Sequence, residues 1–461
     1  MVREMEYKGK NILVFGAGLS GVAAARLLVD LSPNKIILAD DKSSEKVKAD
    51  GLGELKLIGV ELRFGDFTMD ILNDIDLFVI SPGVPRTNLL IQKAVEKNIP
   101  IIGEFELGME LAKCPVIAIT GTNGKTTSVS LIDEIFKNSK DYISELVGNI
   151  NRPVTQIVRT MPKDSSKYVF VAEVSSFQLE TVKEFKPKIA AILNFTPDHL
   201  NRYDSFQHYI DAKVRITENQ DEDDYLILNY DDMHCREIAP RSKAKIFYFS
   251  RKSEIKQGMF VRYGQIMFAQ GDGSKPIYIC NVHDIMLMGA HNLENVLASA
   301  MACLLFGLNV NTISDAIRNF KGVEHRIDFT AEKNGVRYYN DSKSTNVDSL
   351  KKALLSFDQP IILIAGGRDK NSDYDSLTQI IVEKVKKAVL IGEARDRMFR
   401  AWGKKVDCTY AKDMKEAVEI SSEASRTGDI ILLSPACASF DMYNNFEDRG
   451  HDFVKQVHDL I

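Results

Sequence analysis

The sequence has little of what marks a secreted, zinc-clustered or membrane-embedded protein. Its 461 residues include six cysteines and one tryptophan. The cysteines are scattered without a Cys-x-x-Cys pair, so neither a disulfide framework nor a zinc site is expected. No apolar run approaches the roughly 18 residues that a membrane-spanning helix needs, and the first ten residues carry charges of both signs, unlike a signal peptide. We therefore expect a cytoplasmic protein with no membrane insertion.

An excess of basic charge is also missing. Lys and Arg total 59 against 64 for Asp and Glu, which gives a formal net charge of −5. This balance offers no basic face for nucleic acid, although a local positive site could still bind a phosphorylated small molecule. Apolar residues make up 44% of the chain, as in an ordinary globular protein. At this length one hydrophobic core does not suffice, so several domains are expected.

Short apolar runs alternate with helical patterns along the whole chain. Such βαβ alternation predicts a parallel sheet with helices on both faces. The alternation restarts near residues 103 and 322, so we predict an α/β fold of three consecutive Rossmann-like domains with mostly parallel sheets, at residues 1–103, 104–322 and 323–461. Residues 251–283 are more strand- and turn-like and suggest a β excursion from the middle domain. The predicted strands are residues 11–15, 35–39, 77–80, 115–120, 168–174, 188–194, 225–229, 245–249, 360–365, 387–391 and 429–433.

A first glycine-rich loop, Gly-Ala-Gly-Leu-Ser-Gly at residues 16–21, lies between a predicted strand and a predicted helix. Glycines at such a place allow a tight turn and let backbone N–H groups approach a phosphate. Asp40 ends the next strand about 20 residues on, where a dinucleotide enzyme carries its ribose-binding acid. Taken alone, this favours an NAD-dependent dehydrogenase. Asp41 and Lys42 follow, however, and a second phosphate loop comes later, so a nucleotide-diphosphate ligand fits better.

The second glycine loop, Gly-Thr-Asn-Gly-Lys-Thr-Thr at residues 121–127, is more specific. It follows an apolar strand and precedes a helix, the setting in which backbone N–H groups hold phosphates, a lysine reaches the β- and γ-phosphates, and a hydroxyl meets Mg²⁺. Its spacing departs from G-x-x-x-x-G-K-[ST], because Ile119 stands where the first glycine is expected. No guanine-reading Asn-Lys-x-Asp stretch is evident. The loop predicts an ATP-binding P-loop domain.

Polar residues follow two further predicted strands. Glu173 closes the strand at 168–174, and an acid at a strand end beside a phosphate loop is well placed to hold Mg²⁺. The strand at 188–194 leads to Asp198 and His199. Because both strands end at the same sheet edge, a functional role is favoured for His199 over a structural one.

Four other positions carry weaker signals. Lys213 lies on a helical stretch at 209–218, and the residues alone assign it no role. Asn292 precedes an alanine-rich helix and could cap that helix or face a nucleotide base. Arg326 sits at the junction before the third domain, where an arginine can reach phosphates. A polar loop at 340–346 begins another helix.

Together these motifs resemble the Mur ligase family over essentially the whole chain. The residues that carry the resemblance are 121–127, 173–180, 198–199, 291–292, 325–326 and 340–346. Residues 16–21, 81–83, 148–150, 434–439 and 446–450 are most similar to the family members that add D-glutamate. The resemblance implies a monomeric, cytoplasmic ligase of peptidoglycan precursor synthesis, and thus of cell-wall formation and cell division. ATP would phosphorylate the carboxylate of UDP-N-acetylmuramoyl-L-alanine, and the amine of D-glutamate would attack the acyl phosphate.

The resemblance also implies roles for individual residues. The UDP-substrate would contact Leu19, Ser20, Lys42 and Asn149. ATP would contact Gly121, Thr122, Asn123, Gly124, Lys125, Thr126, Thr127, Asn292, Arg326 and Asp341. Two Mg²⁺ ions would be held by Thr126 with Glu173 and by His199 with a carbamylated Lys213. D-glutamate would meet Asp198, Thr345, Lys370, Ser439 and Phe446, and the catalytic residues would be Lys125, His199, Lys213 and Lys343.

Two groups of alternatives stay open at this point. Within the ligase class they are another Mur ligase or a folylpolyglutamate synthetase-like ligase. An Asp-Asn-Pro-Arg stretch typical of the diaminopimelate-adding ligase is absent, and a folylpolyglutamate enzyme is not expected to carry the loop at 16–21. Outside that class, a nucleotide-sensing protein would bind ATP without substrate-dependent phosphate release, and a dehydrogenase would respond to NAD.

Overall fold

The computed structural model describes residues 6–43, 45, 47, 49–65, 68–150, 152–162, 164–198, 202–287, 289–369 and 372–460. His199 and Lys370 lie outside the described residues. The chain forms two compact units: Met1–Val282 with Asn295–Ile317, and His283–Glu294 with Arg318–Ile461. Within the described residues, no helix has the length and apolar character needed to cross a membrane.

The first sheet has five strands in the order β3-β2-β1-β4-β5, all parallel. Side chains of β1 alternate between two core clusters, with Ile12 and Val14 in one and Leu13 and Phe15 in the other. Both faces therefore bury apolar side chains, as the βαβ pattern predicts. The elements are β1 (Asn11–Phe15), α2 (Leu19–Asp30), β2 (Lys35–Asp40), α3 (Leu52–Leu57), β3 (Glu61–Phe64), the 3₁₀ helix η1 (Met69–Leu72), β4 (Leu77–Ile80), α4 (Leu89–Glu96), β5 (Ile101–Gly103) and α5 (Glu104–Leu111).

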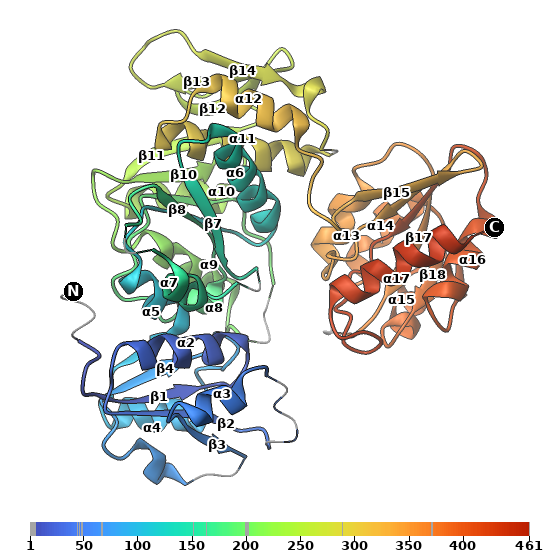
Figure 1. The fold of residues 1–461 in the computed structure, drawn as a ribbon. Helices are drawn as coiled ribbons and strands as arrows, with labels where there is room; N and C mark the ends of the chain where they lie inside the picture. Colours follow the sequence, from blue (N-terminus) through green and yellow to red (C-terminus); the bar gives the residue numbers. More distant parts are fainter. Residues whose placement is uncertain are drawn as a thin grey trace. The chain divides into compact units, whose positions relative to one another are not determined.

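The second sheet belongs to the same unit and has nine strands in the order β14-β13-β12-β11-β10-β9-β6-β8-β7 (Figure 1). Its strands are parallel from β7 to β12. Its strands and helices are β6 (Val116–Thr120), α6 (Lys125–Ser139), β7 (Ile143–Gly148), α7 (Val154–Thr160), β8 (Tyr168–Glu173), α8 (Ser176–Leu179), β9 (Ile189–Ile192), α9 (Phe206–Val214), η2 (Arg215–Thr217), β10 (Tyr225–Asn229), α10 (Met233–Ile238), η3 (Ala239–Arg241), β11 (Lys245–Ser250), β12 (Gln257–Arg262), β13 (Gln265–Gln270), β14 (Ile277–Asn281), η4 (Val282–Asp284), α11 (Ala290–Phe306) and α12 (Val310–Asn319).

The predicted β excursion is confirmed as an antiparallel extension of this sheet. Strand β12 pairs in parallel with β11, and β13 and β14 then follow as antiparallel neighbours. Gly258 makes the first of these pairings possible, because a Cβ there would lie 1.8 Å from the carbonyl oxygen of Tyr248. The extension lengthens the sheet on the side away from β7.

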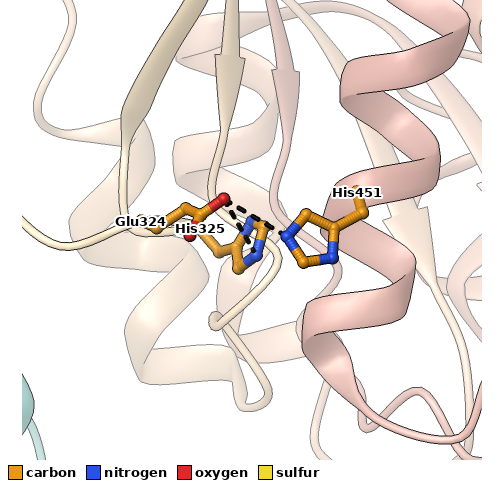
Figure 2. Close-up of side chains that lie close together, drawn as sticks. All are labelled: Glu324, His325 and His451. Atoms are coloured by element: carbon orange, nitrogen blue, oxygen red, sulfur yellow. Dashed lines mark hydrogen bonds and ion pairs between the residues drawn. The ribbon is translucent and has the colours of Figure 1, made fainter.

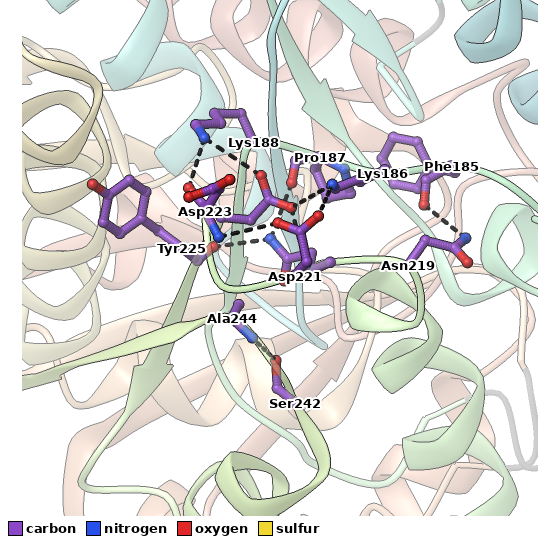
Figure 3. Close-up of polar contacts among 12 residues, drawn as sticks. Phe185, Lys186, Pro187, Lys188, Asn219, Asp221, Asp223, Tyr225, Ser242 and Ala244 are labelled. Carbon is purple, nitrogen blue, oxygen red and sulfur yellow. Dashed lines mark hydrogen bonds and ion pairs between the residues drawn. The ribbon is translucent and has the colours of Figure 1, made fainter.

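Polar contacts fix the loops that enter β9 and β10 (Figure 3). Lys186 forms an ion pair with Asp221 and lies 3.4 Å from Asp224. The side-chain amide of the buried Gln220 donates to the carbonyl oxygens of Pro187 and Tyr225, both at 3.0 Å. These contacts hold the amino ends of β9 and β10. Because the two strands are parallel neighbours, their carboxyl ends lie together at the opposite edge of the sheet, where ligands bind in parallel sheets.

The third sheet belongs to the second unit and has six strands in the order β15-β16-β20-β17-β18-β19. Only β15 runs antiparallel to its neighbour. Ile362 and Ile364 of β17 lie in one core cluster, and Ile361 and Leu363 in another, so this sheet is also buried on both faces. Its elements are β15 (Asp328–Lys333), β16 (Val336–Asn340), α13 (Val347–Leu354), β17 (Ile361–Gly366), η5 (Asp375–Leu377), α14 (Thr378–Lys384), β18 (Val385–Ile391), α15 (Arg395–Trp402), β19 (Asp407–Tyr410), α16 (Met414–Ala424), β20 (Ile430–Leu433) and α17 (Phe446–Asp459).

Candidate active site

The P-loop at residues 121–127 follows β6, and its last three residues begin α6. Gly121 and Gly124 have φ of +142° and +91°, and a Cβ on Gly124 would lie 2.1 Å from Oδ1 of Asn295. The loop is tied to the chain after β9, since the N–H of Asn123 donates to Oδ1 of Asn194 at 2.9 Å. The Lys125 ammonium donates to the carbonyl oxygens of Gly121 and Thr122, each at 2.9 Å. A phosphate held by this loop would replace these two carbonyls as the partner of the lysine.

Glu173, at the end of β8, joins two predicted sites. Its Oε2 accepts a hydrogen bond of 2.7 Å from the Thr126 hydroxyl, and its Oε1 accepts one of 2.8 Å from the side-chain amide of Asn149. Thr126 belongs to the predicted ATP and metal site, and Asn149 to the predicted UDP-substrate site. One buried carboxylate therefore lies at the junction of the two.

The four predicted UDP-substrate residues line one pocket of about 540 Å³. Leu19 and Ser20 begin α2, Lys42 lies just after β2, and Asn149 comes from the loop after β7. The sequence motifs at 81–83 and 148–150 contribute as well. The other residues of the wall are Phe15, Gly16, Gly18, Asp40, Asp41, Ser81, Pro82, Gly83, Val84, Pro85, Gly148, Pro153 and Gln178.

Asp40 has a different use from the ribose contact that a dehydrogenase would need. Its Oδ2 accepts the N–H of Ala17 at 2.8 Å, and its Oδ1 accepts the N–H of Lys42 at 3.0 Å. The carboxylate thus holds the glycine loop against the end of β2. Gly21 allows the first turn of α2 to pack closely against the glycine loop, because a Cβ there would lie 1.9 Å from the carbonyl oxygen of Gly16.

A second pocket of about 490 Å³ adjoins the first and shares Leu19 and Lys42 with it. Arg26 of α2 and Gln156 and Arg159 of α7 also line it. The sequence analysis missed these α7 residues, because they belong to an ordinary amphipathic helix with no motif.

Lys213 is the most unusual side chain near the P-loop. It lies on α9 with only 2% of its surface exposed, and its Nζ is 4.8 Å from the centre of the Tyr209 ring. Burial lowers the pKa of Lys213 well below its ordinary value, the charge of Lys125 lowers it further, and the charges of Asp198 and Glu173 oppose the shift. Compared with an exposed lysine, this shift favours the neutral amine, which is the form that reacts with CO₂.

Several predicted site residues belong to the second unit: Asn292, Arg326, Asp341, Lys343, Thr345, Ser439 and Phe446. Asp341, after β16, accepts a 2.7 Å hydrogen bond from the Ser434 hydroxyl. Burial raises the pKa of Asp341 to about 7, while Ser434 and then Arg326 act against the rise. The backbone N–H of Lys343 donates to the carbonyl oxygen of His325 at 3.1 Å. These contacts bring together the segments that hold Arg326, Asp341 and Lys343.

A buried arginine, Arg449, lies beside the segments that carry Thr345, Ser439 and Phe446, and the sequence alone gave it no role. Arg449 is 1% exposed, and it donates to the carbonyl oxygens of Ser342 at 2.7 Å and Cys437 at 3.0 Å. The Ser342 hydroxyl donates to the carbonyl oxygen of Phe446 at 2.7 Å. Arg449 thereby ties together the segments that carry Thr345, Ser439 and Phe446. Its spacing from Phe446 on one helix was visible in the sequence, but its burial was not.

Asn292 does not cap its helix, because α11 begins at Ala290 and Asn292 lies in the first turn. Of its two possible roles, only the contact with a nucleotide base stays open. The neighbouring His291 is half-buried, and desolvation, followed by the charges of Arg326 and Lys352, lowers its pKa to about 3. Asn346 caps α13, the helix that the polar loop at 340–346 was expected to begin: its Oδ1 accepts the N–H of Ser349 at 2.8 Å.

The sequence matches three family models that together cover most of the chain. They are the Mur ligase MurD-like N-terminal domain at residues 10–103, the Mur ligase middle domain at 119–303 and the Mur ligase glutamate ligase domain at 325–437. The first sheet, the P-loop and the third sheet fall within these three matches in order.

Curated relatives match over the full length. A UDP-N-acetylmuramoylalanine–D-glutamate ligase of Thermoanaerobacter sp. (strain X514) is 44% identical, over 99% of this chain and 100% of its own. A protein of the same name from Clostridioides difficile (strain 630) is 43% identical, again over 99% and 100%.

Solved structures agree on the fold. The MurF ligase of Thermotoga maritima in complex with ADP has a TM-score of 0.62 at 15% identity, over 92% of this chain and 95% of its own. A pseudomurein peptide ligase type C of Methanothermus fervidus has a TM-score of 0.61 at 17% identity, over 97% and 100%. With full-length relatives at this identity and three ordered family matches, the chain belongs to the Mur ligase family.

Proposed function

We propose that this chain joins D-glutamate to UDP-N-acetylmuramoyl-L-alanine, with hydrolysis of ATP to ADP and phosphate. Full-length relatives at 43–44% identity carry the name of this activity. The structural observation that carries the proposal is the shared contact of Glu173 with Asn149 and Thr126. It places the wall of a sugar-nucleotide-sized pocket beside the loop that would present the γ-phosphate.

The first step would be attack of the substrate carboxylate on the γ-phosphorus. Phosphoryl transfer needs in-line reactants and positive charge around the transferring oxygens. Lys125 would supply that charge from the P-loop, with Arg326 and Lys343 contributing from the second unit. The amine of D-glutamate would then attack the acyl carbon, and phosphate would leave with one oxygen of the original carboxylate. Exclusion of water is needed, because an acyl phosphate hydrolyses readily.

The donors present suit Mg²⁺ at the P-loop. Thr126 and Glu173 offer two hard oxygens 2.7 Å apart, and neighbouring oxygens around Mg²⁺ at about 2.0–2.1 Å lie about 2.9 Å apart. When bound, the ion would neutralise charge on the phosphates. Lys213 fits the second predicted ion only after carbamylation, which turns an amine into a carboxylate-like oxygen donor. Its burial lowers the pKa of the amine, and this suits the reaction with CO₂. His199 stays a predicted partner.

D-glutamate brings two carboxylates, and we propose that the second unit binds them. Ser439 and Thr345 would offer hydroxyl donors, Lys370 would offer charge, and Phe446 would cover the site. The Nζ of Lys343 lies 4.9 Å from the centre of the Phe446 ring, so the proposed phosphate and D-glutamate residues adjoin one another in this unit. Asp198 would meet D-glutamate from the first unit. We further propose that the protein acts as a cytoplasmic monomer in precursor synthesis for the cell wall, and that its domains divide at residues 103 and 322.

The test is phosphate release across a panel of amino-acid acceptors. We expect release only when ATP, UDP-N-acetylmuramoyl-L-alanine and D-glutamate are all present. L-glutamate, L-lysine and diaminopimelate serve as matched acceptors. Equal turnover with L-lysine or diaminopimelate would assign the chain to a different Mur ligase reaction, and release without any acceptor would indicate a simple ATPase.

A further inference from the structure

Two histidines and a glutamate gather beside Arg326 in the second unit (Figure 2). Oε1 of Glu324 lies 3.2 Å from Nε2 of His451 and 3.8 Å from Nε2 of His325. The two imidazole rings meet edge to face, with centres 4.7 Å apart. His325 is 2% exposed, whereas Glu324 and His451 reach the surface. Glu324 and His325 precede Arg326 directly, and His451 comes from α17.

The backbone of this segment is strained. His325 and Ile327 have φ of +63° and +48°, in the left-handed region that residues other than glycine rarely adopt. Such strain persists only when surrounding contacts hold it, and it gathers at functional sites. The ring of His325 supplies one such contact: it packs so closely on α17 that a Cβ on Gly450 would lie 2.3 Å from its Nδ1.

The hydrogen bonds around Asn340 decide which nitrogen of His325 carries the proton. The side-chain amide of Asn340 donates to the carbonyl oxygen of Gly450 at 3.1 Å, and its Oδ1 accepts the N–H of Ser342 at 3.1 Å. The same amide nitrogen lies 2.8 Å from Nδ1 of His325. Nδ1 therefore accepts, and the neutral ring carries its hydrogen on Nε2, which faces Glu324.

This tautomer argues against a metal ion at the cluster. Two imidazoles and a carboxylate are common zinc ligands. A metal at Nε2 of His325 would, however, move the proton to Nδ1, where it would face the N–H of Asn340. To accept that proton, the side-chain amide of Asn340 would have to flip, and the flip would break its hydrogen bonds to Gly450 and Ser342. The arrangement favours a carboxylate that is hydrogen-bonded to His451 at 3.2 Å and lies 3.8 Å from Nε2 of His325.

The backbone of the segment is bonded to two other proposed ATP-site and phosphate-site residues of the second unit, Lys343 and Asp341. The carbonyl oxygen of His325 accepts the N–H of Lys343, and the N–H of Ile327 donates to Oδ1 of Asp341 at 3.3 Å. Arg326 lies between these two anchors. Its direction therefore depends on the conformation of the residues on either side.

We propose that Glu324 and His451 are positioning residues that hold His325, and with it Arg326, in the conformation that meets the phosphates of ATP. This inference rests on the proposed role of Arg326 in nucleotide binding. Glu324 forms a hydrogen bond with His451 of α17, and the same carboxylate oxygen faces Nε2 of His325 at 3.8 Å, so the carboxylate links the strained segment to α17. Neither residue touches the nucleotide itself.

The experiment measures binding of a non-hydrolysable ATP analogue to the full chain, together with KM and kcat. We expect His451→Leu to weaken analogue binding and raise the KM for ATP three- to tenfold, with less than a twofold change in the KM for D-glutamate. His451→Gln should restore binding to within twofold of wild type, because its amide N–H still reaches Glu324. His458→Leu, the same change at an exposed site on α17, serves as the matched control and should leave binding unchanged.

The coupling to Arg326 gives the sharpest outcome. In an Arg326→Ala background, His451→Leu should cause no further loss of analogue affinity, whereas additive losses would overturn the proposal. A lower melting temperature with unchanged analogue affinity would show a purely structural role and would also overturn it. So would stoichiometric Zn²⁺ binding that His451→Leu abolishes. Binding of the ATP analogue requires neither D-glutamate nor UDP-N-acetylmuramoyl-L-alanine. A failure of the proposed ligase reaction is therefore distinguishable from a failure of this inference.

Discussion

Lys213 offers the strongest single perturbation of the proposed site. Replacing it by alanine removes the amine and three methylenes from a fully enclosed position on α9. Loss of one preorganised group that stabilises developing charge lowers kcat by about 10²–10³-fold, and we expect at least that for Lys213→Ala. The lost methylenes alone cost about 2 kcal/mol of stability at ~0.8 kcal/mol each. Activity and stability must therefore be measured separately.

A pair of variants separates these two effects. Lys213→Met fills nearly the same space but cannot form a carbamate, so we expect it to be inactive while folding as stably as the wild type. Lys213→Ala leaves a cavity in place of the amine and the methylenes, so formate or acetate should partly restore its phosphate release. Lys213→Met leaves no such room, and the same salts should not rescue it. Lys137→Ala, at a lysine side chain that is 63% exposed on α6, is the matched control.

The chemistry at Lys213 has a direct readout that does not depend on turnover. Wild-type protein in ¹³C-bicarbonate should show a carbamate carbon signal by NMR that Lys213→Met lacks. Normal phosphate release by Lys213→Ala, or the same carbamate signal in both proteins, would refute the reasoning.

Two further predictions follow from single contacts. Thr126→Ser keeps the hydroxyl that donates to Glu173 and should keep kcat/KM for ATP. Thr126→Ala should lower kcat/KM for ATP by about 10- to 100-fold, which corresponds to a hydrogen bond to a charged group of about 1.5–3 kcal/mol. Equal values of kcat/KM for the two variants would contradict this prediction. Burial raises the pKa of Glu104 from 4.5 to about 7 against the hydrogen bonds from Thr155. Its stabilising effect is thus full below pH 4.5 and is lost as pH rises through 7, a fall of about 3 kcal/mol at 1.36 kcal/mol per pH unit. Denaturation curves from pH 4.5 to 8 should show this fall in the wild type but not in Glu104→Gln, and parallel curves would count against it.

The sequence was most informative where chemistry and periodicity act locally. The strands at 11–15, 77–80 and 225–229 have the predicted ends, because buried parallel strands appear as short apolar runs. Both glycine loops stand between a strand and a helix, as expected. Helix ends were less certain: α9 stops at Val214 and continues as a 3₁₀ turn, where the prediction ran to residue 218.

What the sequence could not show depends on tertiary contacts. The burial of Arg449 comes from the return of α17 against the loops after β16 and β20, which no local pattern encodes. Gln156 and Arg159 face a pocket only because α7 packs against α2 of the first sheet. The residues alone gave Lys213 no role, and its proposed role came from the resemblance, because its burial and the nearby charge of Lys125 are tertiary features. The roles of the site residues, and the boundaries at 103 and 322, remain predictions.

The central claim is that the γ-phosphate passes through an acyl phosphate on the sugar-nucleotide substrate. The most direct measurement uses UDP-N-acetylmuramoyl-L-alanine with both carboxylate oxygens labelled with ¹⁸O, incubated with ATP and D-glutamate. The account predicts that each released phosphate carries one ¹⁸O atom and that the new amide keeps the other. Unlabelled phosphate would contradict it, because the carboxylate would then never have bonded to phosphorus.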